Sequence, residues 1–127
     1  MKKVSILAIA MAAAMILAGG DALADKAPKA FKKCKICHSV KPGKHKIGPS
    51  LFGVYGRKAG TAEGFNNGKK RDYKALKGAD WVWDDKSLDG WLENPKKFTG
   101  GKKTKMTAKT KKAKDRKALI EYLKTLK

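Results

Sequence analysis

The sequence predicts an all-α fold in which short helices and long loops form one small domain around a bound group. Three observations lead to this prediction. The last segment of the chain has the apolar spacing of a helix, and two cysteines are followed directly by a histidine. After residue 24, only 17 of 103 residues are Leu, Ile, Val or Phe, while the net charge of that segment is +19. A chain so poor in large apolar residues stays unfolded unless something else completes its core.

The first 24 residues are typical of a secretory signal. Lys2 and Lys3 precede an apolar run from Val4 to Ala18, and small residues stand at the last and third-last positions of the segment. The alternative is an uncleaved membrane anchor, but the run is shorter than the roughly 20 residues that a span needs. We therefore expect cleavage after Ala24, a single mature domain over residues 25–127, and export to the periplasm.

The first half of the mature chain is predicted to be mostly loop, with two short helices. Pro28 suits the first turn of a short helix from about Lys29 to Cys37. Residues 43–68 carry seven glycines with little apolar periodicity, which predicts a loop. A basic helix is expected over residues 69–78.

Two clearer helices are predicted in the second half. Asp84 or Asp85 can cap a helix that ends before Asn94 and Pro95, because a residue that precedes proline disfavours helical geometry. The last helix begins at about Asp115. Its apolar residues follow helical spacing: Leu119, Ile120, Tyr122, Leu123 and Leu126.

The segment Cys34-Lys35-Ile36-Cys37-His38 indicates covalent attachment of haem. The two thiols would form thioethers with the vinyl groups, and His38 would reach the iron. Zinc and a thioredoxin-like redox pair are the alternatives. Zinc lacks ligands, since only His38 and His45 could join the cysteines, and no strand and helix alternation of the redox type surrounds the pair. Export agrees with haem attachment.

A second axial ligand is expected from Met106. It is the one methionine of the mature chain, and its neighbours are polar, so it has no apolar face to join. His45 is the competing ligand, but it follows His38 by only seven residues, too few to pass round the porphyrin. With both axial positions filled, the chemistry that remains is transfer of one electron, which favours a carrier and not an enzyme. The other hypotheses are a haem enzyme or gas sensor with a displaceable sixth ligand, and a basic nucleic-acid or membrane-binding protein without haem.

An ordered series of motifs makes the chain resemble the soluble class I cytochromes c of the mitochondrial and alphaproteobacterial kind. The resemblance covers nearly all of residues 26–127. Its motifs are Cys34 to His38, His45 to Leu51, Gly53 to Gly60, Trp91 to Phe98, Thr104-Lys105-Met106 and Leu119 to Leu123. It implies one covalent haem c with His38 and Met106 as axial ligands.

The resemblance also implies roles for residues around the haem. Pro49 would accept a hydrogen bond from His38, and Arg57 and Trp83 would lie near the propionates. Leu51, Trp91 and Leu92 would line the crevice. The chain departs from the family pattern at residues 99–103, a longer loop without the usual proline, and at Trp91, which replaces a tyrosine.

The positive net charge of the chain indicates what kind of partner it binds. The resemblance places five lysines around the haem edge: Lys33, Lys46, Lys96, Lys97 and Lys105. Such a ring would steer acidic redox proteins into transient, salt-sensitive complexes. A membrane quinol-oxidising complex or a periplasmic dehydrogenase would be the donor, and a terminal oxidase the acceptor. Anionic lipid is a weaker partner, nucleic acid is excluded by export, and the protein is expected to be a monomer.

Overall fold

A computed structural model describes residues 26–65 and 74–127. Their helical elements are η1 (Lys29–Ile36), η2 (Lys74–Leu76), α2 (Asp85–Glu93), α3 (Pro95–Phe98) and α4 (Ala113–Lys124). Within these ranges the only β pairing is one isolated bridge between Lys58 and Val82. The prediction of an all-α fold is confirmed. The predicted signal segment lies outside the described residues.

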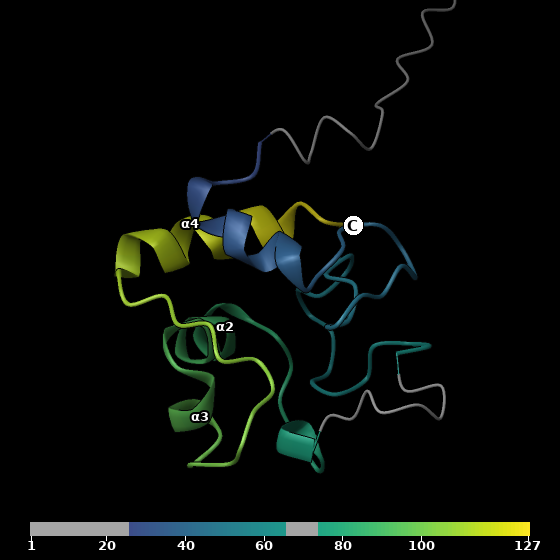
Figure 1. Cartoon of the computed structure of the whole chain (residues 1–127), viewed down its shortest axis with the longest axis vertical. Helices are drawn as coiled ribbons and strands as arrows, with labels where there is room; N and C mark the ends of the chain where they lie inside the picture. The colour runs from purple at the N-terminus through teal and green to yellow at the C-terminus, as the bar shows by residue number, and fades with distance from the viewer. Residues whose placement is uncertain (1–25, 66–73) are drawn as a thin grey trace, which may run out of the picture.

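Helix α4 is the element on which the others are arranged. It packs against α2 and crosses η1, so the two ends of the domain lie together, while α3 contacts α2 (Figure 1). The remaining chain consists of long loops, as predicted for residues 43–65. Of the helix expected over residues 69–78, the part from residue 74 on is described, and it holds the single 3-10 turn η2. No helix among the described residues is long and apolar enough to cross a membrane.

Local capping explains where the middle helices begin and end. The side chain of Asp84 accepts a hydrogen bond from the Ser87 N–H at 2.8 Å and caps α2. Helix α2 ends at Glu93, as Pro95 predicts, but the chain turns back into helix at once. The Asn94 side chain accepts from the Lys97 N–H at 3.2 Å, and Pro95 takes the first helical position of α3. The sequence patterns above do not predict helix α3.

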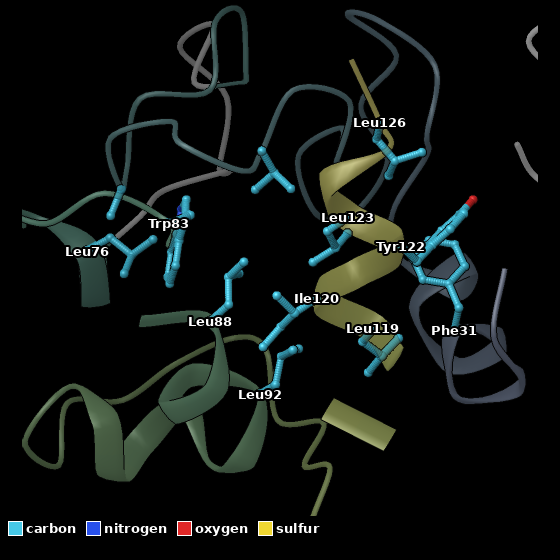
Figure 2. Close-up of a cluster of buried hydrophobic side chains, with 12 residues drawn as sticks. Phe31, Leu76, Trp83, Leu88, Leu92, Leu119, Ile120, Tyr122, Leu123 and Leu126 are labelled. Atoms are coloured by element: carbon cyan, nitrogen blue, oxygen red, sulfur yellow. The ribbon is translucent and has the colours of Figure 1, made fainter. Parts of the chain in front are cut away.

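The core joins η1, α2 and α4. Phe31 of η1 is fully buried, with its ring 4.8 Å from that of Tyr122. Figure 2 shows Leu88 and Leu92 of α2 pointing toward Ile120 of α4. The contacts come from one face of α4, since its buried residues recur at helical spacing.

A buried cation ties the end of one loop to this core. Arg116 of α4 is 8% exposed; its Nε donates to Asp89 of α2 at 2.7 Å, and its Nη1 donates to the carbonyls of Thr110 and Lys111 at 3.0 and 2.7 Å. Every carbonyl in this group gains a charged donor, which compensates the cost of burying the guanidinium. The loop that precedes α4 is thereby fixed at its last turn.

Candidate functional site

A large cavity lies between η1, the glycine-rich loop, α2 and the loop over residues 102–108. Its volume is about 1030 Å³. Most of its wall is apolar, and its apolar residues include Leu51, Val54, Leu76, Trp83, Leu88, Trp91, Leu92, Leu119 and Leu123. Many of the few large apolar residues of the chain thus face this space as well as one another, which explains how a domain so poor in them can form around a flat apolar group.

Both cysteines open onto this cavity as free thiols. The last turn of η1 places them there, because the backbone N–H groups of Cys37 and His38 both donate to the Cys34 carbonyl, at 3.1 and 2.8 Å. Burial raises the pKa of the Cys34 thiol. Two thiols on one wall of an apolar cavity suit thioether formation with a ligand inside it.

His38 presents one defined ring nitrogen to the cavity. Its Nδ1 lies 2.7 Å from the Pro49 carbonyl, which can only accept, so Nδ1 carries the proton and Nε2 keeps a lone pair. Burial lowers the pKa of His38; the hydrogen bond to Pro49 opposes this, and the charges of Arg57 and Lys46 add to it. The imidazole is therefore neutral near pH 7, as a metal ligand must be.

Gly48 fixes the position of that ring from behind. A β-carbon at Gly48 would overlap Cε1 of His38 and lie 2.9 Å from its Nε2. The backbone can approach the ring this closely only because residue 48 has no side chain.

Met106 reaches the cavity from the opposite segment of the chain. Its sulfur accepts a hydrogen bond from Nε1 of Trp91 at 3.2 Å, and its carbonyl accepts one from the Thr104 hydroxyl at 2.8 Å. The indole N–H occupies one sulfur lone pair and leaves the other for a ligand bond. The loop around Met106 is anchored at its ends, where Gly101 N donates to the Lys96 carbonyl and Thr110 N to the Leu92 carbonyl.

The charged groups of the cavity wall share one sign. The charged residues that line it within the described chain are Lys33, Arg57, Lys74, Lys102, Lys103 and Lys105, and none is acidic. The Arg57 guanidinium donates to the carbonyls of Ser50 and Phe52 at 3.3 to 3.4 Å. This wall suits a ligand whose own substituents are anionic, such as the propionates of haem.

His45 lies in a different part of the fold from the cavity wall. Its Nδ1 accepts from the Ser50 N–H at 3.0 Å, and its Nε2 donates to the Glu63 carbonyl at 2.8 Å. Both ring nitrogens are used, and the ring packs edge-on against Phe65 at 5.6 Å. His45 thus clamps two loops together and is not positioned as a ligand.

The lysines expected around the haem edge fall into two groups. The Lys33 amine donates to the Lys109 carbonyl at 2.9 Å and the Lys46 amine to the Lys35 carbonyl at 2.5 Å. Lys96, Lys97 and Lys105 are exposed, the first two on α3 and the third on the cavity wall. All five lie on the surface, with two held against the backbone.

Sequence reasoning missed two parts of the site. The close packing of Gly48 on His38 has a signal in the Gly48-Pro49 pair, but its reason is visible only in three dimensions. The other is a cluster of aromatic rings in edge contact, in which Trp83 lies 5.3 Å from Trp91 and 6.0 Å from Trp81, and Phe98 lies 5.3 Å from Trp81. This cluster supports the wall that carries the Trp91 indole.

The family model and the relatives that match this chain are all cytochromes c. The family model described as cytochrome c matches residues 24–127. Cytochrome c2 iso-2 of Magnetospirillum molischianum is 50% identical over 101 residues, which cover 80% of this chain and 98% of that protein. Cytochrome c of Gibberella zeae is 45% identical over 111 residues, which cover 85% of this chain and 96% of that protein.

Solved structures agree. The ferricytochrome c2 of Rhodopseudomonas palustris superposes with a TM-score of 0.63 at 36% identity, covering 77% of this chain and 93% of that one. Cytochrome cH from Methylobacterium extorquens has a TM-score of 0.61 at 37% identity, covering 84% of this chain and 99% of that one. The two thiols, the neutral histidine, the thioether and the cationic apolar wall fit one covalent haem c. The chain therefore belongs to the cytochrome c family, with a class I fold of the alphaproteobacterial type, and is a mono-haem electron carrier.

Proposed function

We propose that this chain is a periplasmic one-electron carrier in which His38 and Met106 ligate the haem iron from its two faces. The observation that carries the proposal is the convergence, in one cavity, of two thiols, an imidazole with a free Nε2 and a thioether with a free lone pair. When bound, the haem supplies a site that gains and loses one electron. His38 and Met106 would hold the iron, and the apolar wall of the cavity would keep water away from it.

The two ligands are held by neutral hydrogen bonds that need not change with oxidation state. Pro49 fixes the orientation of His38, and the Trp91 N–H fixes the sulfur of Met106. An indole donor beside the thioether withdraws electron density from it, which stabilises the reduced state. With no position left for a substrate, the arrangement favours a carrier over an enzyme.

Partners and location follow from the charge and from the N-terminal sequence. The 24-residue leader supports export, and haem attachment of this type is carried out after export. The cationic surface supports brief complexes with acidic proteins, which salt weakens over a Debye length of about 8 Å. We assign the donor to a membrane quinol-oxidising complex or a periplasmic dehydrogenase, and the acceptor to a terminal oxidase. Anionic lipid is a weaker partner, and the working form is a monomer.

Replacement of Met106 by alanine tests this assignment. The holoprotein with Met106→Ala should lose the far-red sulfur-to-iron absorption band and show a lower reduction potential, while the haem stays attached. Thr107→Ala, in the same loop and also on the cavity wall, is the matched control and should keep the band. His45→Gln should keep it as well.

An unchanged far-red band in Met106→Ala would contradict the ligand assignment. Ferrous wild-type protein that binds carbon monoxide rapidly at neutral pH would instead point to the displaceable sixth position of a haem enzyme or sensor.

A further inference from the structure

A glycine lies inside helix α2, where it lowers the stability of the helix relative to alanine. Gly90 is not required for backbone conformation, because its φ lies outside the left-handed region. It is required for space: a β-carbon on Gly90 would lie 2.6 Å from Cδ2 and 3.1 Å from Cε2 of Phe98. Gly90 therefore leaves room for the Phe98 ring on the surface of α2.

The Phe98 ring contacts the indole of Trp91, the residue that follows Gly90. The two ring centroids are 6.3 Å apart with their planes at 89°, and Trp83 lies against the same indole at 5.3 Å and 63°. Edge-to-face contacts of this kind orient aromatic rings as well as burying them. The orientation of the Trp91 indole is thus set by rings from two other segments of the chain.

Phe98 also lies at the start of the loop that leads to Met106. It is the last residue of α3, which follows α2 directly (Figure 1). The loop leaves α3 through Gly100 and Gly101, whose φ values of 69° and 93° lie in the left-handed region. Two successive glycines leave this segment little stiffness of its own. The position of Met106 therefore depends on how firmly α3 is held against α2.

The same ring is thus connected to the donor and to the acceptor of one hydrogen bond. Nε1 of Trp91 donates to the sulfur of Met106 at 3.2 Å. Phe98 contacts the donor directly, and its place on Gly90 fixes the helix from which the loop of the acceptor begins. A change at Phe98 would therefore alter the alignment of this hydrogen bond from both sides.

We propose that Phe98, packed on Gly90, is a positioning residue that holds the Trp91 N–H on the Met106 sulfur and thereby sets the reduction potential. This inference rests on the proposed function and deepens it, since it requires Met106 to ligate the iron. The N–H withdraws electron density from the thioether and so favours the reduced state. Without the Phe98 ring, the indole can turn away from the sulfur, and the potential falls.

Variants of the holoprotein test this proposal by redox titration against one reference couple. Trp91→Phe removes the N–H and keeps an aromatic ring, so the equilibrium constant for reduction should fall about threefold to tenfold. Phe98→Leu removes the ring and keeps an apolar side chain, and should lower the constant about threefold. Gly90→Ala should lower it as well, because the new methyl group displaces the ring, although alanine favours the helix.

The double variant Trp91→Phe with Phe98→Leu separates positioning from other effects. If Phe98 acts through the indole N–H, loss of its ring has no further effect once the N–H is gone. The double variant should therefore have the potential of Trp91→Phe alone. The far-red sulfur-to-iron band should shift in each single variant and no further in the double one. Phe98→Tyr, which keeps the ring, should keep the wild-type band and potential.

Leu126→Ala is the control for a loss of stability alone. Leu126 is 2% exposed and is not part of the cavity wall. Its truncation removes buried packing, so it should lower Tm and leave both the far-red band and the potential unchanged.

A wild-type potential in Phe98→Leu or in Gly90→Ala would overturn the proposal and leave the carrier function standing. Additive effects of Trp91→Phe and Phe98→Leu would also overturn it, as would a potential that falls in Leu126→Ala as far as in Phe98→Leu. A far-red band that persists in Met106→Ala would instead remove the ligand assignment, and this proposal with it.

Discussion

Gly48 determines how closely the backbone can pack against the His38 ring. Its backbone φ lies outside the left-handed region, so the glycine is required for space and not for conformation. The adjacent Pro49 carbonyl then receives the Nδ1 proton at 2.7 Å. Two successive residues thus set the position and the tautomer of one ring.

Gly48→Ala should move the His38 ring away from the Pro49 carbonyl, because the new methyl group would overlap it. Overpacking of this kind costs about 1 to 3 kcal/mol. We expect a lower Tm together with a shifted reduction potential of the holoprotein, measured by thermal unfolding and redox titration.

Gly43→Ala is the control for that experiment. Gly43 has a φ of 64°, and a methyl group on its α-carbon would have no neighbouring atom within 4 Å. Alanine there adds backbone strain of about 1 kcal/mol but no collision. It should lower Tm and leave the potential unchanged. A Gly48→Ala protein with the wild-type potential would contradict the role given to Gly48.

Helix α2 depends on a carboxylate at its first turn. The hydrogen bond that Asp84 accepts from the Ser87 N–H holds the pKa of Asp84 below its usual value. Because the folded pKa is the lower one, this interaction stabilises the fold above the unfolded pKa and is lost as pH falls through the folded value. Asp85 behaves alike, since Lys124 and Tyr55 lower its pKa.

Asp84→Asn should therefore flatten the acid side of the stability profile. Asparagine caps a helix about as well as aspartate but carries no charge to lose. Thermal unfolding of the holoprotein between about pH 7 and pH 3 should show a smaller fall in Tm for the variant than for the wild type. Asp80→Asn, which removes an exposed carboxylate that caps no helix, is the control. Equal acid slopes in Asp84→Asn and the wild type would contradict this account of α2.

Elements with local signals were predictable, and elements set by distant contacts were not. Asp84 and the Asn94-Pro95 pair mark the two ends of α2 in the sequence itself. The return to helix in α3 was missed because Asn94 both ends one helix and caps the next. Likewise, the site residues could be named from their motifs. The hydrogen bonds of two lysines could not, because the Lys33 amine donates to a carbonyl 76 residues away and the Lys46 amine to one 11 residues away.

For the molecule as a whole, the haem is part of the core. The apolar residues of η1, α2 and α4 that do not pack on one another face the 1030 Å³ cavity. Without the cofactor, that wall would be exposed to water, and repulsion among the cations of a domain with a charge of +19 would remain.

The apoprotein should therefore be largely unfolded. Cys34→Ala with Cys37→Ala, prepared without haem, is expected to lose most of the helical circular dichroism in the far ultraviolet and to be digested rapidly by trypsin. The wild-type holoprotein is the control. A helical apoprotein that resists trypsin would show that the chain completes its core without the cofactor.

The positive charge of the cavity wall also acts before any contact is made. Six of the eight described acidic residues belong to α2 with its cap or to α4: Asp84, Asp85, Asp89, Glu93, Asp115 and Glu121. Among the described residues, the charged groups of the cavity wall are all cations, so we expect the molecule to carry an electric dipole with its positive end there. In the field of an acidic partner this dipole experiences a torque. We expect the carrier to turn while it diffuses, so that more of its collisions are productive than the small area of its docking surface would give by chance.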